Sequence, residues 1–188
     1  MTNKRYISEQ QMKTGVLDIV SQIYRDEWRP DYIVGITRGG LIPAVMMSHY
    51  TGIKMHTLDV RLRDADHDPE HACWMAEDAF GYIDRADRVQ EELDGEMQWI
   101  CSDPAKRKKI LIVDDINDTG ETFNWIKKDW EDSCLPSDPH WLDIWGNTVR
   151  WATIIDNVPS KFDVDYSSIE INKAENPEWI VFPFEEWW

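Results

Sequence analysis

One segment in the middle of the chain constrains the fold more than any other, the run ILIVDDINDTGET at residues 110–122. Its first four residues are apolar with no polar residue between them, which is typical of a strand that is covered on both faces. The remaining nine residues form a polar stretch that contains Gly120, and a helix is predicted over about 123–130. A buried strand that leads through a loop into a helix indicates an α/β protein with a parallel sheet.

The residues before this segment predict a unit of the same kind. Ser8 and Gln11 have the spacing of a helix capping box, and Pro30 closes the apolar periodicity that follows them. Gly39 and Gly40 interrupt the next apolar run, so a strand, a tight turn, a helix and a further strand are expected in succession. The predicted elements are a helix from Ser8 to about Trp28, a strand over 31–36, a helix over 41–50, a strand over 54–60 and, later in the chain, a strand over 149–155.

Residues 61–109 have a different character, because charged residues are frequent and β-branched residues are few. We interpret this stretch as a loop followed by one or two surface helices, one of them over about 80–93, inserted at one end of the sheet. With 188 residues, the chain is long enough for one α/β domain over 1–188 but hardly for two.

The overall composition argues against several classes of function. The formal net charge of −16 repels the phosphate backbone of a nucleic acid and an anionic lipid surface. No window of the sequence contains the roughly 18 apolar residues that would span a bilayer, so a cytoplasmic protein with no nucleic-acid or membrane partner is expected. Cys73, Cys101 and Cys134 are odd in number and far apart, which predicts three free thiols.

Two parts of the segment 110–122 carry the predicted chemistry. In parallel α/β sheets, ligands bind beyond the carboxyl ends of the strands. Residues 118–122 lie there and precede a helix N-terminus, whose N–H groups and dipole favour a phosphate. Asp114 and Asp115 stand at the strand end, where burial is unfavourable unless the carboxylates meet a cation or the hydroxyl groups of a ligand. The sequence therefore predicts a site for a sugar phosphate held with Mg²⁺.

Three motifs resemble those of one enzyme family. The run ILIVDDINDTGET resembles the phosphoribosyl-pyrophosphate (PRPP) motif of the type I phosphoribosyltransferases, and GITRGGLIP at 35–43 is similar to their pyrophosphate loop. PEWIVFPFE at 177–185 resembles the C-terminal hood of the xanthine-guanine and hypoxanthine-type purine enzymes. The resemblance implies the type I fold, a parallel sheet flanked by helices in a single domain. It also implies a small C-terminal hood over 156–188. The flexible loop and insertion that we expect over 61–108 lacks a convincing counterpart in the family.

The resemblance assigns roles to the residues of the PRPP motif. Asp114 and Asp115 would hold the ribose hydroxyls and the Mg²⁺ ion. Asp118 would act as the catalytic base toward N7 of a purine. The 5′-phosphate would bind to one loop, made of Asp118, Thr119, Gly120, Glu121 and Thr122.

Residues outside this motif are assigned in the same way. Arg38 and Gly39 would contact pyrophosphate, and the peptide bond between them is a candidate for a cis bond. Trp179 would stack on the base, while the backbone of Ile180 reads its edge.

One position departs from the pattern of the purine enzymes. They usually carry a lysine where this chain has Asn157, and the lysine ammonium donates to a 6-oxo group. An amide can donate to an oxygen or accept from an amine, so the preference for one base is left open. Lys161 is an alternative donor if its loop folds back.

The resemblance implies an enzyme that transfers the 5-phosphoribosyl group from PRPP to hypoxanthine, guanine or xanthine and releases pyrophosphate. Two alternatives stay open: a catalytically inactive PRPP-binding regulatory protein, and a phosphoribosyltransferase for another nucleobase. The implied partners are PRPP and a nucleobase, with Mg²⁺ as cofactor. The aromatic content and the habit of the family favour a homodimer or homotetramer.

Overall fold

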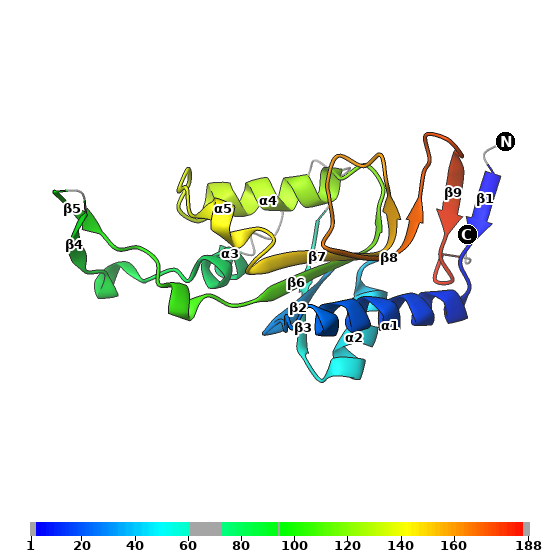
Figure 1. Ribbon diagram of the computed structural model, residues 1–188, viewed down its shortest axis with the longest axis horizontal. Helices are drawn as coiled ribbons and strands as arrows, with labels where there is room; N and C mark the ends of the chain where they lie inside the picture. The colour runs from blue at the N-terminus through cyan, green and yellow to red at the C-terminus, as the bar shows by residue number, and fades with distance from the viewer. Residues whose placement is uncertain (1–2, 61–72, 94, 186–188) are drawn as a thin grey trace.

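Five parallel strands form the central sheet, in the order β3-β2-β6-β7-β8 (Figure 1). The computed structural model describes residues 3–60, 73–93 and 95–185 of the chain. The strands are β2 (Tyr32–Ile36), β3 (Lys54–Leu58), β6 (Ile110–Asn117), β7 (Val149–Asn157) and β8 (Tyr166–Ile171).

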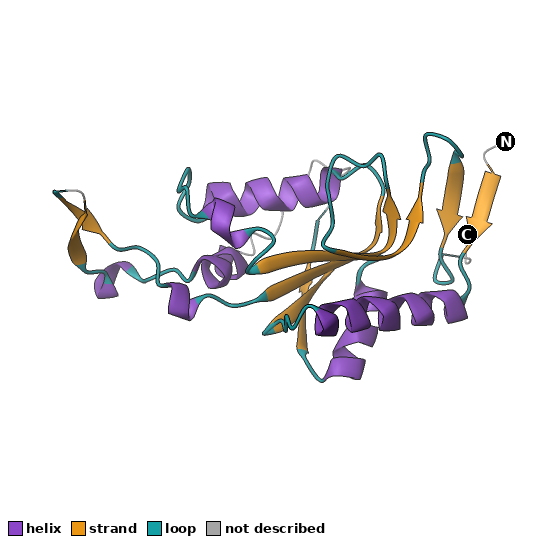
Figure 2. Cartoon of the chain, viewed as in Figure 1, coloured by secondary structure: helices purple, strands orange, loops and turns teal. Residues whose placement is uncertain are grey.

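Helices cover both faces of this sheet, as the colouring of Figure 2 shows. On one face lie α1 (Glu9–Arg25) and α2 (Leu41–Thr51). On the other face lie α3 (Cys73–Phe80), α4 (Glu121–Ser133) and α5 (Trp141–Ile144). The parallel sheet flanked by helices that the sequence predicts is confirmed.

Strand β6 is covered by helices on both faces, which explains why its sequence begins with an unbroken apolar run. Ile110 and Ile112 belong to the apolar cluster beneath α3, α4 and α5, whereas Leu111 and Val113 belong to the cluster beneath α1 and α2. Successive side chains of a strand point to opposite faces, so a strand buried on both faces needs an apolar residue at every position.

Helix α1 begins where its capping box predicts. The backbone N–H of Gln11 donates to the Ser8 hydroxyl at 3.2 Å, and the backbone N–H of Ser8 donates to the Gln11 side chain at 2.9 Å. The helix ends at Arg25, three residues before the predicted end at Trp28, because Glu27 adopts a left-handed conformation with φ 51°.

A second, two-stranded sheet forms from the two ends of the chain, where β1 (Asn3–Tyr6) pairs in parallel with β9 (Glu178–Val181). It lies beyond β8 in Figure 1, and Ile180 packs in the same apolar cluster as Ile171 of β8. The range 156–188, expected as a hood, therefore contains an edge strand of the main sheet as well as β9. Strand β1 was not predicted, because its four residues are mostly polar and lack the apolar pattern of a strand.

The prediction of a surface helix over 80–93 is wrong. Helix α3 ends at Phe80, and the chain then forms an antiparallel hairpin of β4 (Gln90–Leu93) and β5 (Glu96–Trp99). Gly81 causes the break: it has φ 69°, and a Cβ there would lie 2.3 Å from the carbonyl oxygen of Asp103. Of the flexible loop and insertion expected over 61–108, residues 61–72 lie outside the described residues.

Two predictions from composition concern the whole chain. Cys73, Cys101 and Cys134 are all free, as predicted. Among the residues that the structure describes, no helix has the length and apolar character needed to cross a bilayer.

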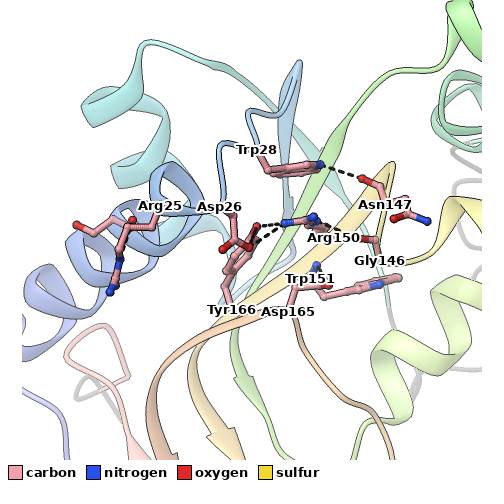
Figure 3. A network of polar contacts seen from close by, with 10 residues as sticks. Arg25, Asp26, Trp28, Gly146, Asn147, Arg150, Trp151, Asp165 and Tyr166 are labelled. Carbon is pink, nitrogen blue, oxygen red and sulfur yellow. Dashed lines mark hydrogen bonds and ion pairs between the residues drawn. The ribbon is translucent and has the colours of Figure 1, made fainter.

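A network of polar and aromatic contacts at the amino end of β7 joins α1 to the sheet (Figure 3). The Arg150 guanidinium donates to the carbonyl of Gly146 at 2.9 Å and to the carboxylate of Asp26 at 3.1 Å, and it lies 5.0 Å from the ring centroid of Trp28. The hydroxyl of Tyr166, the first residue of β8, bonds both Arg150 and Asp26. The Arg150 side chain is only 20% exposed, whereas that of its partner Asp26 is 53% exposed.

We expect Arg150→Met to lower the free energy of unfolding by about 2–3 kcal/mol, because it removes charged hydrogen bonds and a cation–π contact together. Urea denaturation of the two proteins measures the difference. Arg25→Met is the matched control, because Arg25 points away from the network in Figure 3 and, among the described residues, its side chain bonds only the exposed backbone of its own helix at Ser21. A loss as large in the control would contradict the assignment.

Candidate active site

Two acidic residues lie at the carboxyl end of the central strand. Strand β6 continues four residues beyond the predicted run, so that Asp114 and Asp115 belong to the strand and are half-buried. The backbone N–H of Asp115 donates to Oδ1 of Asp114 at 2.9 Å. The carboxyl end of a parallel strand is the edge at which ligands of such sheets bind.

The turn after β2 packs directly on these two residues. A Cβ on Gly39 would lie 2.1 Å from Oδ2 of Asp115, and a Cβ on Gly40 would lie 2.4 Å from the carbonyl oxygen of Val113. Both distances are far below van der Waals contact, so only glycine permits this approach of backbone to carboxylate. The turn contains a cis peptide bond, but it joins Thr37 to Arg38, one residue before the predicted position.

Arg38 lies in the same turn. Its side chain is exposed, and its carbonyl accepts a hydrogen bond from the N–H of Leu41 at 3.3 Å. Thr37 is fixed by two bonds to the end of β3: its N–H donates to the carbonyl of Leu58 at 2.9 Å, and its hydroxyl donates to Asp59 at 2.6 Å. The structure thus brings the Arg38 backbone to the edge at which the acidic pair lies.

The ionised forms of the two carboxylates, Asp114 and Asp115, are unfavourable in this environment. Burial, followed by the charge of Asp115, raises the pKa of Asp114 well above its ordinary value. Burial also raises the pKa of Asp115 to about 6, with a further contribution from Glu185. No ion pair in the described part of the chain involves either carboxylate. A cation at this place would favour the ionised forms of both groups.

The donor set fits Mg²⁺. Two neighbouring carboxylates are hard oxygen ligands, and Mg²⁺ commonly binds through one or two carboxylates together with the phosphates of a substrate. Within the described residues, no group of three or more His, Cys, Asp or Glu side chains converges as a metal site. The pair Asp114 and Asp115 could therefore hold Mg²⁺ together with oxygen atoms of a bound ligand.

The loop that follows the acidic pair leads into the N-terminus of helix α4. Gly120 caps helix α4 in a left-handed conformation with φ 80°, and a Cβ there would lie 2.7 Å from Cβ of Phe162. The N–H of Lys161 donates to the carbonyl of Thr119 at 3.2 Å, so a second loop covers this one. Glu121 and Thr122 begin α4, whose first N–H groups have no partner inside the helix and point toward the loop.

Asn157 has a different environment from the one expected for a base-binding residue. It is 6% exposed, and its amide Nδ2 donates to the carbonyl of Asp118 at 2.8 Å and to its carboxylate at 3.4 Å. Its Oδ1 accepts from the backbone N–H of Lys173 at 3.0 Å. Both ends of the amide are thus occupied by the protein.

Lys173 and Asn117 also lie in this region, and neither was predicted from the sequence. The ammonium of Lys173 lies 2.8 Å from Oδ2 of Asp118, although 55 residues separate the two in sequence. Asn117 is 1% exposed and donates to Asp156 and to the carbonyl of Phe162, each at 2.7 Å, which fixes the covering loop. No local sequence pattern marks either residue, since each acts through partners that are distant in the chain.

Trp179 and Ile180 lie on β9 in the small sheet. Trp179 is 56% exposed and stands opposite Lys4 of β1, whereas Ile180 is 5% exposed and packs in the core. In the described part of the chain, no hydrogen bond or ion pair joins these two side chains to the acidic pair. The segment after β9 does approach it, because Glu185 contributes to the raised pKa of Asp115.

The sequence and fold were compared with known proteins. The profile of the phosphoribosyl transferase domain family matches residues 3–186. A search of curated protein sequences returned no match. A solved purine phosphoribosyltransferase from Pyrococcus horikoshii is similar, with 22% identity and a TM-score of 0.61 over 98% of this chain and 96% of that one.

Two further solved structures are similar at lower identity. The xanthine-guanine-hypoxanthine phosphoribosyltransferase of Helicobacter pylori has 16% identity and a TM-score of 0.61, over 97% of this chain and 94% of its own. A hypothetical protein of Neisseria gonorrhoeae with bound ppGpp has 16% identity and a TM-score of 0.59, over 98% and 90%. At these identities the similarity shows the fold, which is the one that the sequence implies.

The raised pKa of Asp115 predicts that the stability of the folded protein decreases as the pH rises. Because the pKa of Asp115 is higher in the folded protein than in the unfolded chain, its contribution to stability is present below about pH 4 and is lost as the pH rises through about 6. In EDTA, Asp115→Asn should therefore raise the free energy of unfolding at pH 7 by about 1–2 kcal/mol and flatten its decline between about pH 4 and 6.

Urea denaturation at several pH values measures this effect. Asp132→Asn, which changes an exposed acid of α4, is the matched control and should alter the free energy of unfolding by less than about 0.5 kcal/mol. An Asp115→Asn protein that is no more stable than the wild type at pH 7 would show that the carboxylate is not strained there.

Proposed function

The chain belongs to the phosphoribosyl transferase domain family, and from this premise we propose that it transfers the 5-phosphoribosyl group of PRPP to a purine base, with release of pyrophosphate. The observation that carries the proposal is the packing of Gly39 and Gly40 on Asp114 and Asp115 at the carboxyl edge of the sheet. This packing joins a turn that can receive pyrophosphate to a carboxylate pair that suits Mg²⁺ and ribose hydroxyls.

PRPP would bind across three loops of this edge. Asp114 and Asp115 would hold the ribose hydroxyls and, with them, the metal. The loop 118–122 would bind the 5′-phosphate through its hydroxyls and the N–H groups at the start of α4. Arg38 and the backbone of Gly39 would contact pyrophosphate. When bound, Mg²⁺ would supply positive charge that neutralises the departing pyrophosphate.

The proposed reaction is a displacement at C1 of the ribose. A ring nitrogen of the purine forms the bond to C1 while the bond from C1 to the pyrophosphate oxygen breaks, and the sugar gains oxocarbenium character. Asp118 accepts the proton that leaves N7 of the base. Its carboxylate is 44% exposed, and it is held in place by the Asn157 amide, which we assign to positioning Asp118. The exposed indole of Trp179 would stack on the base, and the backbone of Ile180 would read its edge.

The proposal is tested by incubating the protein with Mg²⁺·PRPP and, separately, hypoxanthine, guanine, xanthine, adenine and uracil. We expect nucleotide and pyrophosphate to form in equal amounts with at least one of the three 6-oxopurines. The protein without Mg²⁺ is the control, and it should form no product. Binding of PRPP without product from any base would favour a regulatory protein, and product from uracil alone would contradict the purine assignment.

The role of Asp118 is tested by Asp118→Asn. Loss of the base should reduce kcat by about 10²–10⁴-fold, which corresponds to about 3–5 kcal/mol of activation free energy. The dissociation constant of Mg²⁺·PRPP, measured by calorimetry, should change by less than about threefold, because the acidic pair is intact. Asp132→Asn on α4 is the control for the loss of one negative charge. Turnover equal to that of the wild type would exclude Asp118 as the base.

A further inference from the structure

We propose that two copies of this chain form a dimer by exchanging arms, so that the β4–β5 hairpin of each copy docks into a basic, aromatic groove of the other. The arm comprises residues 81–103. The groove lies at the amino ends of β2 and β3 and is lined by Arg29, Tyr32, Lys54, His56, Trp74 and Lys108. The inference goes beyond the proposed function, because both surfaces lie away from the carboxyl edge of the sheet.

The arm has a defined structure of its own. Near its base, the backbone N–H of Ile83 donates to the carbonyl of Cys101 at 2.9 Å, and β4 and β5 pair in antiparallel register beyond this point. The Arg88 guanidinium donates to the carbonyl of Ile83 at 3.0 Å and lies 4.9 Å from the ring centroid of Tyr82. Figure 1 shows the hairpin extending beyond the sheet and the helices, so its end is presented to solvent.

The end of the arm exposes apolar side chains. Val89, Met97 and Trp99 are 55%, 60% and 59% exposed, and every residue of β5 is exposed. Met97 and Trp99 lie two positions apart in the strand, so they share one face of the hairpin. A two-stranded hairpin by itself is only marginally stable in water, and exposed apolar surface of this kind marks interaction sites. This face therefore calls for a partner surface.

The end of the arm is also acidic. The segment 90–100 contains four acidic residues and no lysine or arginine. Glu92 stands opposite Met97 in the register of the hairpin, so a carboxylate borders the apolar face. A surface that fits the arm must therefore combine apolar groups with positive charge.

The groove supplies the apolar groups. Three rings meet there: the ring centroids of Tyr32 and His56 are 5.1 Å apart, those of His56 and Trp74 are 5.1 Å apart, and those of Tyr32 and Trp74 are 5.8 Å apart. Tyr32 is 7% exposed, whereas Trp74 is 45% exposed, so the indole is open to a partner above a buried ring. The groove has a volume of about 580 Å³, which gives room for large side chains.

The groove also supplies the positive charge. Its lining contains three basic residues, Arg29, Lys54 and Lys108, and two acidic residues, Asp31 and Asp78. No ion pair in the described part of the chain involves any of the three cations. The lining is thus net positive in a chain whose formal net charge is −16, which complements the acidic end of the arm.

A second copy of the chain satisfies both surfaces at once. Lys108 belongs to the segment 104–109, which joins the arm to β6, so the groove lies at the same end of the molecule as the base of the arm. Two copies related by a two-fold axis each place one arm in the groove of the other, and both contacts close together. The net charge of the chain opposes any association that lacks such local complementarity.

The test is sedimentation velocity of the full-length protein over a series of concentrations. We expect a dimer whose dissociation constant rises with salt, because the contact joins opposite charges. Replacing the apolar end of the arm, by Met97→Ser with Trp99→Ser, should raise the dissociation constant by about 100-fold or more. Leu142→Ser on α5 is the matched control: it removes an apolar side chain that is 79% exposed, and it should leave the dissociation constant unchanged.

A groove variant and a mixture test the exchange itself. Lys54→Glu with Lys108→Glu should weaken the dimer by about tenfold or more, whereas the same charge change at exposed Lys13 and Lys128 should alter the dissociation constant by less than about threefold. In a mixture, one arm and one groove remain intact and face each other. The arm variant and the groove variant should therefore form a heterodimer at least about tenfold tighter than the homodimer of either.

Three results would overturn the inference. One is a wild type that remains monomeric at every concentration, which would leave the arm to a protein of different sequence. Another is a dimer that the arm variant does not weaken. The third is a mixture of weakened arm and groove variants that forms no heterodimer, because two arms that pair with each other would behave in this way.

Discussion

The contact between two glycines and two aspartates organises this structure. Strand β6 places Asp114 and Asp115 at the carboxyl edge of the sheet, and the neighbouring strand β2 delivers Gly39 and Gly40 onto them. A side chain at either glycine would overlap the carboxylate or the strand backbone. Only a bare main chain can lie so close. In the proposed function, the turn, the strand end and the start of α4 act together as one site.

Burying two neighbouring carboxylates is unfavourable for the stability of the folded protein. The contacts that stabilise the fold lie elsewhere. Burial raises the pKa of Asp114 and of Asp115, so their ionised forms are unfavourable in the folded protein. Apolar clusters on both faces of the sheet bury most of the large side chains. The Arg150 network joins α1 to β7 at the opposite edge, the amino ends of the strands. The proposed site and the Arg150 network thus lie at opposite edges of the same sheet.

Local sequence patterns were sufficient to predict those elements whose signals lie within a few residues of each other. The segment 110–122 was predicted as a strand, a polar loop and a helix, because its apolar run and its glycine are local signals. The prediction of a helix over 80–93 is wrong, because Gly81 ends α3 and packs against Asp103 and Arg107, which are distant in the sequence. The role expected of Asn157 changed for the same reason: its partners Asp118 and Lys173 come from two other loops.

The sequence by itself determined the α/β class, the order of its main elements and the residue types that face the carboxyl edge, because periodicity, capping and glycine conformation act over a few residues. Only the tertiary structure decided that β1 pairs with β9, that the cis bond precedes Arg38 and that Lys173 reaches Asp118. Those pairings join residues far apart in the chain. Their free energy comes from packing and hydrogen bonds that exist only once the sheet has brought its loops to one edge.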